Sequence, residues 1–123
     1  IGDINYYKYN DLDNALRYYR ITANNFPEHS LSQVSLYKSG EILRKIKQWE
    51  EAIKIYDDFV NRFKTSSYRD DAYYYIGECY HNMGRLRHAK NSYYLVLGDF
   101  PNSKWNDVIY NKLQSINKIL KGI

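Results

Sequence analysis

Apolar side chains recur along the chain at steps of three and four residues, the spacing that places them on one face of an α-helix. The longest stripes cover 12–26, 49–63 and 86–100. Shorter helical patterns cover about 31–46, 70–83 and 103–120. Pro and Gly are scarce within these stretches, which favours helix over strand or loop. The pattern therefore predicts an all-α chain of helices joined by short turns.

The helical pattern repeats with a period of 37 residues. Ala15, Ala52 and Ala89 are spaced by 37, and so are Gly40 and Gly77. The same spacing relates further sets, namely Leu12, Trp49 and Leu86; Tyr19, Tyr56 and Tyr93; Phe26, Phe63 and Phe100; Leu36, Tyr73 and Tyr110; and Ile42, Cys79 and Ile116. Many columns in one register indicate a repeated structural unit. Each unit is predicted to be an antiparallel helix pair, whose Gly and Ala columns let the two helices approach closely.

The register predicts one domain over 1–123. Repeat 1 covers about 1–29 and is truncated at its N-terminal side, repeat 2 about 30–66, repeat 3 about 67–102, and a capping helix about 103–121. The cap is expected to turn Tyr110, Leu113 and Ile116 inward. Its outer side is expected to be polar, with Asn106, Gln114, Ser115, Lys118 and Lys121. Because the chain begins with Ile1 inside a helical pattern, we expect it to be a fragment of a longer protein.

Two kinds of connection alternate along this register. Asn10, Lys47 and Gly84 occupy the turn within each pair, where left-handed backbone geometry favours Gly or Asn and disfavours Lys47. The joints between repeats read "FPEHS", "FKTSS" and "FPNSK". Pro ends a helix because it lacks an N–H and restricts the preceding residue. We expect Ser30, Ser67 and Ser103 to cap the helices that follow.

These columns resemble the tetratricopeptide repeat, over nearly the whole chain. The 37-residue period and the "FP" joints are similar to the bacterial cell-envelope branch of that family, which includes outer-membrane-assembly lipoproteins and the periplasmic coordinator of the Tol-Pal system. The resemblance implies a right-handed α-solenoid of about two and a half to three repeats. It also implies that the first helix of each pair lines a concave face.

That face is the expected partner-binding site. Repeated tyrosines with mixed charge around them suit an extended peptide or a partner helix, although ordinary solvated helix positions would show the same residues. The candidate residues are Tyr37, Glu41, Arg44, Lys45, Tyr74, Glu78, His81, Asn82, Asn111, Ser115 and Lys118. Chaperone-docking family members carry Lys and Asn in these columns to hold a terminal carboxylate. Glu41 and Glu78 stand here instead, so we do not expect that ligand.

Composition narrows the classes of function. The net charge is +4, and the basic residues are interleaved with acidic ones, which is typical of solvated helix faces and argues against nucleic-acid binding. No segment has the length of apolar sequence that a membrane span needs. Cys79, the single cysteine, shares a column with isoleucines and is interpreted as a core residue. The sequence contains no metal-ligand spacing, nucleotide-binding motif or nucleophile motif, so we expect neither a cofactor nor catalysis.

The sequence therefore favours a non-catalytic adaptor or scaffold that binds or stabilises a protein of a bacterial cell envelope, in the periplasm or at the outer membrane. Two alternatives remain open. Association through the ends of the solenoid would use the apolar face around Leu16 and Tyr19, which the truncated first repeat leaves under-covered. The chain could instead be an accessory domain of an enzyme whose catalytic part lies elsewhere.

Overall fold

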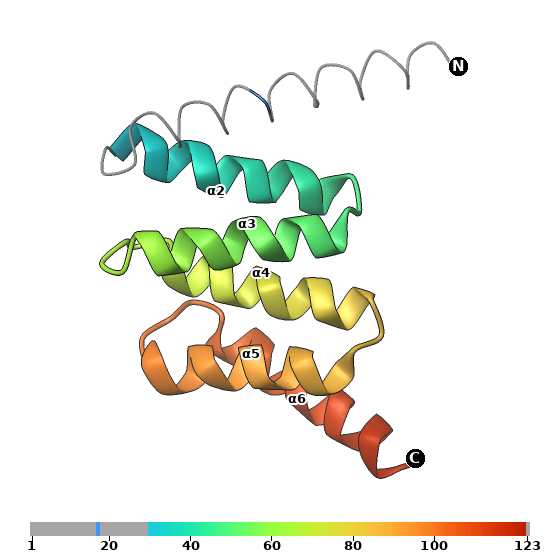
Figure 1. The fold of residues 1–123 in the computed structure, drawn as a ribbon. Helices are drawn as coiled ribbons and strands as arrows, with labels where there is room; N and C mark the ends of the chain where they lie inside the picture. The colour runs from blue at the N-terminus through green and yellow to red at the C-terminus, as the bar shows by residue number, and fades with distance from the viewer. Residues whose placement is uncertain (1–16, 18–29, 123) are drawn as a thin grey trace, which may run out of the picture.

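The computed structural model describes residue 17 and residues 30–122. Its helices are α2 (Ser30–Lys45), α3 (Trp49–Arg62), α4 (Arg69–Asn82), α5 (Leu86–Asp99) and α6 (Asn106–Lys121). Each helix contacts the next along the chain, and α2, α3, α4 and α5 run alternately in opposite directions (Figure 1). Within residues 30–122 all regular structure is helical, as the hydrophobic pattern predicts. The expected helices of repeat 1 lie outside the described residues.

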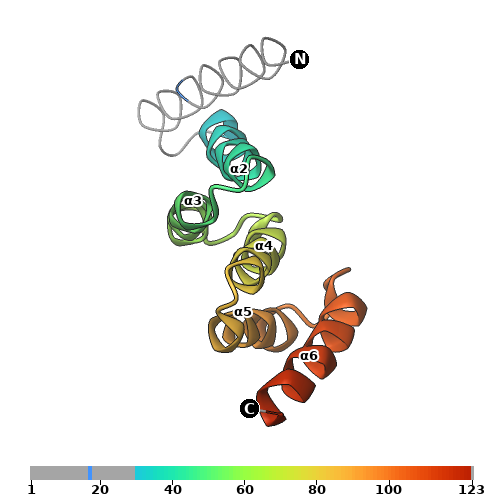
Figure 2. The same cartoon turned by 90° about the vertical axis from the view of Figure 1, so that its right-hand side faces the viewer.

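The helices form two layers. Viewed along their axes, α2, α4 and α6 lie on one side and α3 and α5 on the other (Figure 2). We call the side formed by α2, α4 and α6 the first-helix face, and the opposite side the second-helix face. The largest side chains buried between the layers include Tyr56, Phe59 and Tyr93, each 0% exposed. The apolar stripes of the sequence therefore mark the contact between the layers.

Each helix pair is held close by a glycine facing a tyrosine. A Cβ atom built on Gly40 would lie 2.7 Å from the Tyr56 ring, and one built on Gly77 would lie 2.6 Å from the Tyr93 ring. Both distances are far below van der Waals contact, so a side chain at either position would force the helices apart. Ala52 and Ala89 are fully buried in the partner helices, as their columns predict.

The turns within the pairs have left-handed residues at the predicted positions. Lys47 has φ 64° and Gly84 has φ 77°. In both turns the following residue closes the helix end, since the N–H of Gln48 donates to the carbonyl of Leu43 and that of Arg85 to the carbonyl of Tyr80, each at 2.9 Å. Lys47 therefore adopts a conformation that a side chain disfavours.

The joints between repeats share one geometry, with or without proline. Phe63 and Phe100 leave the helical region at ψ 69° and 71°. The expectation that Ser67 caps α4 is wrong, because Ser66 is the serine that accepts the N–H of Tyr68, at 3.1 Å. Ser103, which is 37 residues further on, accepts the N–H of Trp105 at 3.2 Å. These serines close short turns before the helices, and the caps of α4 and α6 have no side-chain hydrogen bond.

The capping helix α6 crosses α5 obliquely instead of lying along it (Figures 1 and 2). Ile109, Leu113 and Ile116 attach it to the core and are at most 5% exposed. The expectation that Tyr110 points inward is wrong, since its side chain is 59% exposed. Tyr73, its equivalent in α4, packs on Phe100 at 6.1 Å between ring centroids. Within the described residues no second helix covers Tyr110 in that way.

Candidate functional site

A groove of about 300 Å³ opens on the first-helix face between α2 and α4. All of its residues come from these two helices or from the segments just before α4 and α6, and none from α3 or α5. The lining residues are Val34, Tyr37, Lys38, Glu41, Tyr68, Asp71, Tyr75 and Lys104. The groove thus combines three tyrosines with two lysines and two carboxylates. Only Tyr37 and Glu41 among them belong to the predicted site.

Tyr37 is a wall of this groove and not a projecting anchor. Its ring stacks on that of Tyr68, with centroids 5.1 Å apart and 28° between planes, and packs on Tyr56 and Phe59 at 5.9 and 5.6 Å. Only 9% of the side chain is exposed. Desolvation therefore raises the pKa of its hydroxyl well above the ordinary value.

Tyr74 is still more deeply buried, at 4% exposure. It stacks on Trp105 with 3.9 Å between ring centroids and 9° between planes, and its hydroxyl donates to Oε1 of Glu78 at 2.8 Å. The expectation that Tyr37 and Tyr74 stand on a polar, solvated face is therefore wrong. Each ring stacks on the aromatic residue that precedes the next first helix, so both tyrosines seal the contact between repeats.

The carboxylates of the first-helix face that lie in or beside the groove are paired with lysines. Glu41 lies 3.5 Å from Nζ of Lys38, and Glu78 lies 3.1 Å from Nζ of Lys112. Asp71 is 8% exposed, and its Oδ1 accepts Nε1–H of Trp105 at 2.6 Å. Nζ of Lys104 lies 3.3 Å from the same oxygen. The expected negative columns of Glu41 and Glu78 are thus neutralised by neighbouring lysines.

Arg44 is held at the contact between repeats 2 and 3. Its guanidinium carbon lies 4.0 Å from the centroid of the Tyr75 ring, and its Nε donates to the hydroxyl of Tyr56 at 3.4 Å. A cation over an aromatic face is stabilised by the ring quadrupole. In the next repeat the equivalent residues are His81, Lys112 and Tyr93, and the buried Tyr93 hydroxyl has no hydrogen-bond partner.

The other predicted residues are more scattered. Lys45 is exposed at the end of α2, and Asn82 donates to the carbonyl of Glu78 at 3.0 Å. The three predicted residues of the cap line a separate groove of about 540 Å³ on α6. Its lining residues are Asn111, Gln114, Ser115, Asn117, Lys118 and Lys121. Two of the eleven predicted residues thus line the groove between α2 and α4, three line the groove on α6, and the other six line neither.

Two of the groove residues that the sequence did not predict lie one position after the predicted tyrosines. Lys38 and Tyr75 occupy the column directly after Tyr37 and Tyr74, and they line the groove where the predicted column is buried. A signal for them was present, because this column holds Lys38, Tyr75 and Lys112, three long side chains with polar ends. Tyr68 and Lys104 precede their helices. Tyr68 shares an aromatic column with Trp105, 37 residues further on, whereas Lys104 shares its column with Ser67 and carries no periodic signal.

Among residues 17 and 30–122, no three His, Cys, Asp or Glu side chains come together as a metal site. Cys79 is fully buried, and desolvation raises the pKa of its thiol to about 11, which keeps it protonated. Its interpretation as a core residue is confirmed. None of the described helices is long and apolar enough to cross a membrane.

Paired antiparallel helices stacked in two layers, with a groove along the first helices, define the class of helical-repeat proteins. The family model of the tetratricopeptide repeat matches residues 34–66 and 71–103. The chain therefore belongs to the tetratricopeptide repeat family, whose members generally mediate protein–protein interaction and are typically non-catalytic. A sequence comparison with curated proteins finds no match.

Proposed function

We propose that the chain is a non-catalytic adaptor or scaffold that binds a partner protein in the groove between α2 and α4. The observation that carries the proposal is the groove itself, which places three tyrosine rings beside paired charges at the junction of two repeats. Val34 and Tyr68 border it with 40% and 41% of their side chains exposed. Aromatic rings on a rigid scaffold are favoured anchors for a partner because they lose little entropy on binding.

The partner is proposed to be a protein of a bacterial cell envelope, which the chain holds or stabilises in the periplasm or at the outer membrane. This part of the proposal is supported by the 37-residue period and the "FP" joints at Phe26 and Phe100. Fractionation of cells that encode the chain tests it. Recovery of both chain and partner with envelope fractions is expected, and recovery of both with the cytosol would refute the envelope assignment.

A matched pair of tyrosine variants tests the groove. Tyr68→Ser removes an exposed ring from the groove, whereas Tyr94→Ser removes a ring of similar exposure, 47%, from α5 on the second-helix face. A partner captured by the wild-type chain is identified, purified and titrated against each variant. We expect about tenfold weaker binding for Tyr68→Ser and no change for Tyr94→Ser. Equal affinities, with helical circular dichroism intact, would rule out the groove.

Association through the ends of the solenoid is the second candidate function. One observation on α6 argues against association through the C-terminal end. In the glycine column of Gly40 and Gly77 the cap carries Gln114, which is exposed. A second helix packed on α6 could not bring a tyrosine against Gln114 in the way that α5 brings Tyr93 against Gly77. The face near Leu16 and Tyr19 lies outside the described residues. Size-exclusion chromatography with light scattering distinguishes a monomer from an end-to-end oligomer.

An accessory role beside a catalytic domain is the third candidate, and the full reading frame tests it. A catalytic domain encoded in the same frame, with activity that falls when this chain is deleted, would support that role.

A further inference from the structure

We propose that the segment bound in the groove between α2 and α4 is acidic, with at least one apolar side chain among its carboxylates. The inference rests on the proposed function and adds the chemistry of the partner. It is carried by the state of the carboxylates in and beside the groove, by the surplus of cations around them, and by the contrast with the second-helix face.

The carboxylates in and beside the groove are already satisfied. Glu41 and Glu78 each have a lysine within 3.5 Å, and Asp71 has both Lys104 and the indole N–H of Trp105. A cationic ligand would have to displace a lysine from its carboxylate, and it would recover only the interaction that was broken. These acidic residues are therefore poor sites for a basic partner.

The cations near the groove, in contrast, can still bind an anion. Arg44 rests on the ring of Tyr75 and the hydroxyl of Tyr56, and no ion pair joins Arg44 or Lys45 to a carboxylate among the described residues. The ammonium-bearing side chains of Lys38 and Lys104 are 51% and 70% exposed while paired. Each of these two lysines can therefore contact a second anion without leaving the first.

The first-helix face carries a positive surplus on α2 and α6, whereas α4 holds three carboxylates against one arginine. Helices α2, α4 and α6 hold seven basic residues against five acidic ones, and Lys104 adds an eighth cation just before α6. The basic residues of the three helices are Lys38, Arg44, Lys45, Arg69, Lys112, Lys118 and Lys121, and the acidic ones are Glu41, Asp70, Asp71, Glu78 and Asp107.

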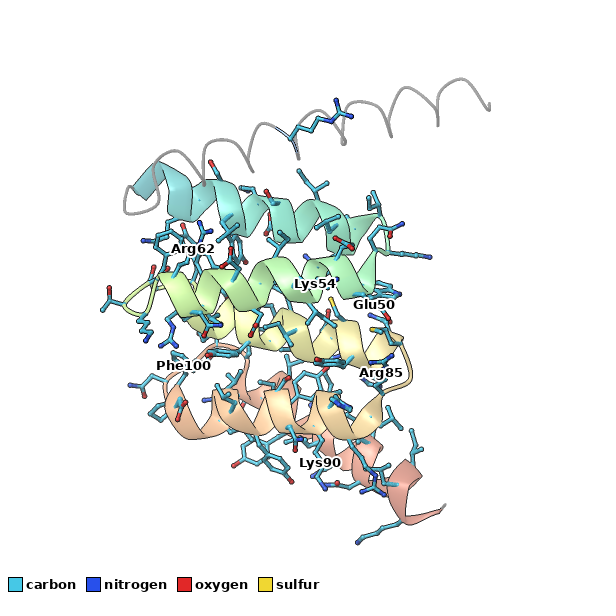
Figure 3. The ribbon with its side chains drawn as sticks, in the orientation of Figure 1. Glu50, Lys54, Arg62, Arg85, Lys90 and Phe100 are labelled. Atoms are coloured by element: carbon cyan, nitrogen blue, oxygen red, sulfur yellow. The ribbon has the colours of Figure 1, made fainter. Side chains whose placement is uncertain are left out.

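The second-helix face has a smaller surplus. Figure 3 shows several of its charged residues, including Glu50, Lys54 and Lys90, on α3 and α5. Arg85, just before α5, lies 3.8 Å from Glu50. With Lys47 and Arg85 included, which precede α3 and α5, the cations Lys47, Lys54, Arg62, Arg85, Arg87 and Lys90 exceed by one the carboxylates Glu50, Glu51, Asp57, Asp58 and Asp99. The larger surplus thus lies on the first-helix face, where it raises the association rate and the specificity for an acidic partner.

The apolar surface next to these cations favours a protein segment over a nucleic acid. Val34 and Tyr68 lie among the groove's lysines and can receive an aliphatic or aromatic side chain of the partner. One face of the Tyr68 ring is already stacked on Tyr37. Strong binding to nucleic acid rests on many phosphate contacts along the backbone, whereas this face offers a small surplus on α2 and α6, with the acidic α4 between them.

A selection followed by a titration tests the inference. The domain is immobilised and presented with a displayed library of random peptides of about twelve residues, and the selected peptides are synthesised with labels. We expect them to be net negative with one or more apolar residues. Their affinity is expected to fall at least about fivefold between about 50 and 300 mM NaCl, because screening weakens attraction between exposed charges.

Matched lysine variants show which face of the domain binds the selected peptide. Lys45→Gln/Lys104→Gln on the first-helix face is expected to weaken the selected peptide about tenfold, while Lys54→Gln/Lys90→Gln on the second-helix face leaves it unchanged. Lys45→Arg/Lys104→Arg keeps the charges and is expected to keep most of the affinity. All four lysines are at or near the surface, and circular dichroism confirms the fold of each variant.

The outcomes separate the inference from the proposed function. Selection of neutral or basic peptides, or equal binding by the two glutamine variants, would overturn the acidic-partner inference and leave the groove as a binding site. Binding of single-stranded DNA as tight as that of the selected peptides would overturn it too, in favour of a polyanion site. Selection of no peptide at all would overturn the proposed function together with the inference.

Discussion

The ring of Tyr93 on α5 fills the space that a side chain at Gly77 of α4 would need. A Cβ atom built on Gly77 would lie 2.6 Å from Cε1 and 2.8 Å from Cδ1 of that ring. Tyr93 is fully buried and packs in turn on Tyr74, with 5.9 Å between ring centroids. The ring therefore cannot withdraw without disturbing the contact between repeat and cap. Gly40 and Tyr56 repeat the arrangement 37 residues earlier.

Gly77→Ala is expected to lower the free energy of unfolding by about 1–3 kcal/mol, the usual cost of overpacking a core. Urea denaturation followed by circular dichroism measures the change. The matched control is Gly98→Ala on α5, where no atom lies within 4 Å of the added Cβ and helix propensity favours Ala by about 0.5–1 kcal/mol. A neutral Gly77→Ala variant would show that α4 and α5 can separate at little cost.

Lys47→Gly is expected to stabilise the chain by about 1 kcal/mol. Lys47 has φ 64°, a conformation that costs a residue with a side chain about 1–2 kcal/mol and costs glycine almost nothing. The gain is partly offset because glycine has more freedom in the unfolded chain. Gly84→Ala, at φ 77°, is the reciprocal change and should destabilise by a similar amount. The same denaturation measurement checks both, and a loss of stability in Lys47→Gly would contradict the argument.

The close approach at Gly40 and Gly77 and the turn positions of Lys47 and Gly84 could be predicted from the sequence, because each depends on local geometry repeated at a fixed period. That Tyr56 and Tyr93 fill the space opposite the two glycines was not predicted. The candidate site was harder to predict because it depends on which of two adjacent columns faces out. Tyr37 and Lys38 differ by one step of about 100° on the helix. Tyr37 is a buried wall of the groove, and the column of Lys38 and Tyr75 lines it with the more exposed side chains.

Burial decides between the two columns, because the Tyr37 and Tyr74 rings stack on Tyr68 and Trp105 of the next repeat. Each of those partners lies 31 residues further along the sequence, and no pattern along a single helix reveals such a contact. The exposure of Tyr110 was missed for a related reason, since its burial would need a second helix packed over α6.

The unpartnered hydroxyl of Tyr93 predicts a stabilising double substitution. Tyr56 accepts a hydrogen bond from Arg44, whose guanidinium rests on Tyr75. His81→Arg/Lys112→Tyr recreates that arrangement around Tyr93, and we expect it to raise the free energy of unfolding by about 1 kcal/mol, the net value of one hydrogen bond. Loss of the partly exposed pair between Lys112 and Glu78 offsets little of this gain.

The two single variants complete a double-mutant cycle, measured by urea denaturation. His81→Arg alone brings a second cation beside Lys112 and should gain less than the double variant. Strict additivity of the two single changes would mean that the introduced arginine and tyrosine do not interact, and a gain from His81→Arg that is zero would discard the hydrogen bond to Tyr93.

Cys79 is expected to report global unfolding. Its thiol is fully buried with a pKa raised to about 11, so the native chain should not react with a thiol-specific disulfide reagent at about pH 8. The reaction rate should follow the unfolded fraction as denaturant is added, and it should match the unfolding curve from circular dichroism. Rapid labelling without denaturant would indicate local opening of α4 and would contradict the packing described around it.

The pH dependence of stability should contain a contribution from His81. Burial first, and then the nearby charge of Lys112, lower the pKa of its imidazole below the ordinary value of 6.5, with Glu78 opposing them. Between the lowered pKa and 6.5 the unfolded chain binds more protons than the folded one, so stability rises with pH there. The contribution is fully present above pH 6.5 and is lost as the pH falls toward the pKa of the folded state.

A pair of histidine variants isolates this contribution. His81→Gln should lose less stability than the wild type between about pH 7.5 and 5.5, because glutamine does not titrate in that range. His88→Gln, at an exposed position on α5, should follow the wild type. Urea denaturation at the two pH values measures all three chains. Identical losses in the two variants would show that His81 is not the group responsible.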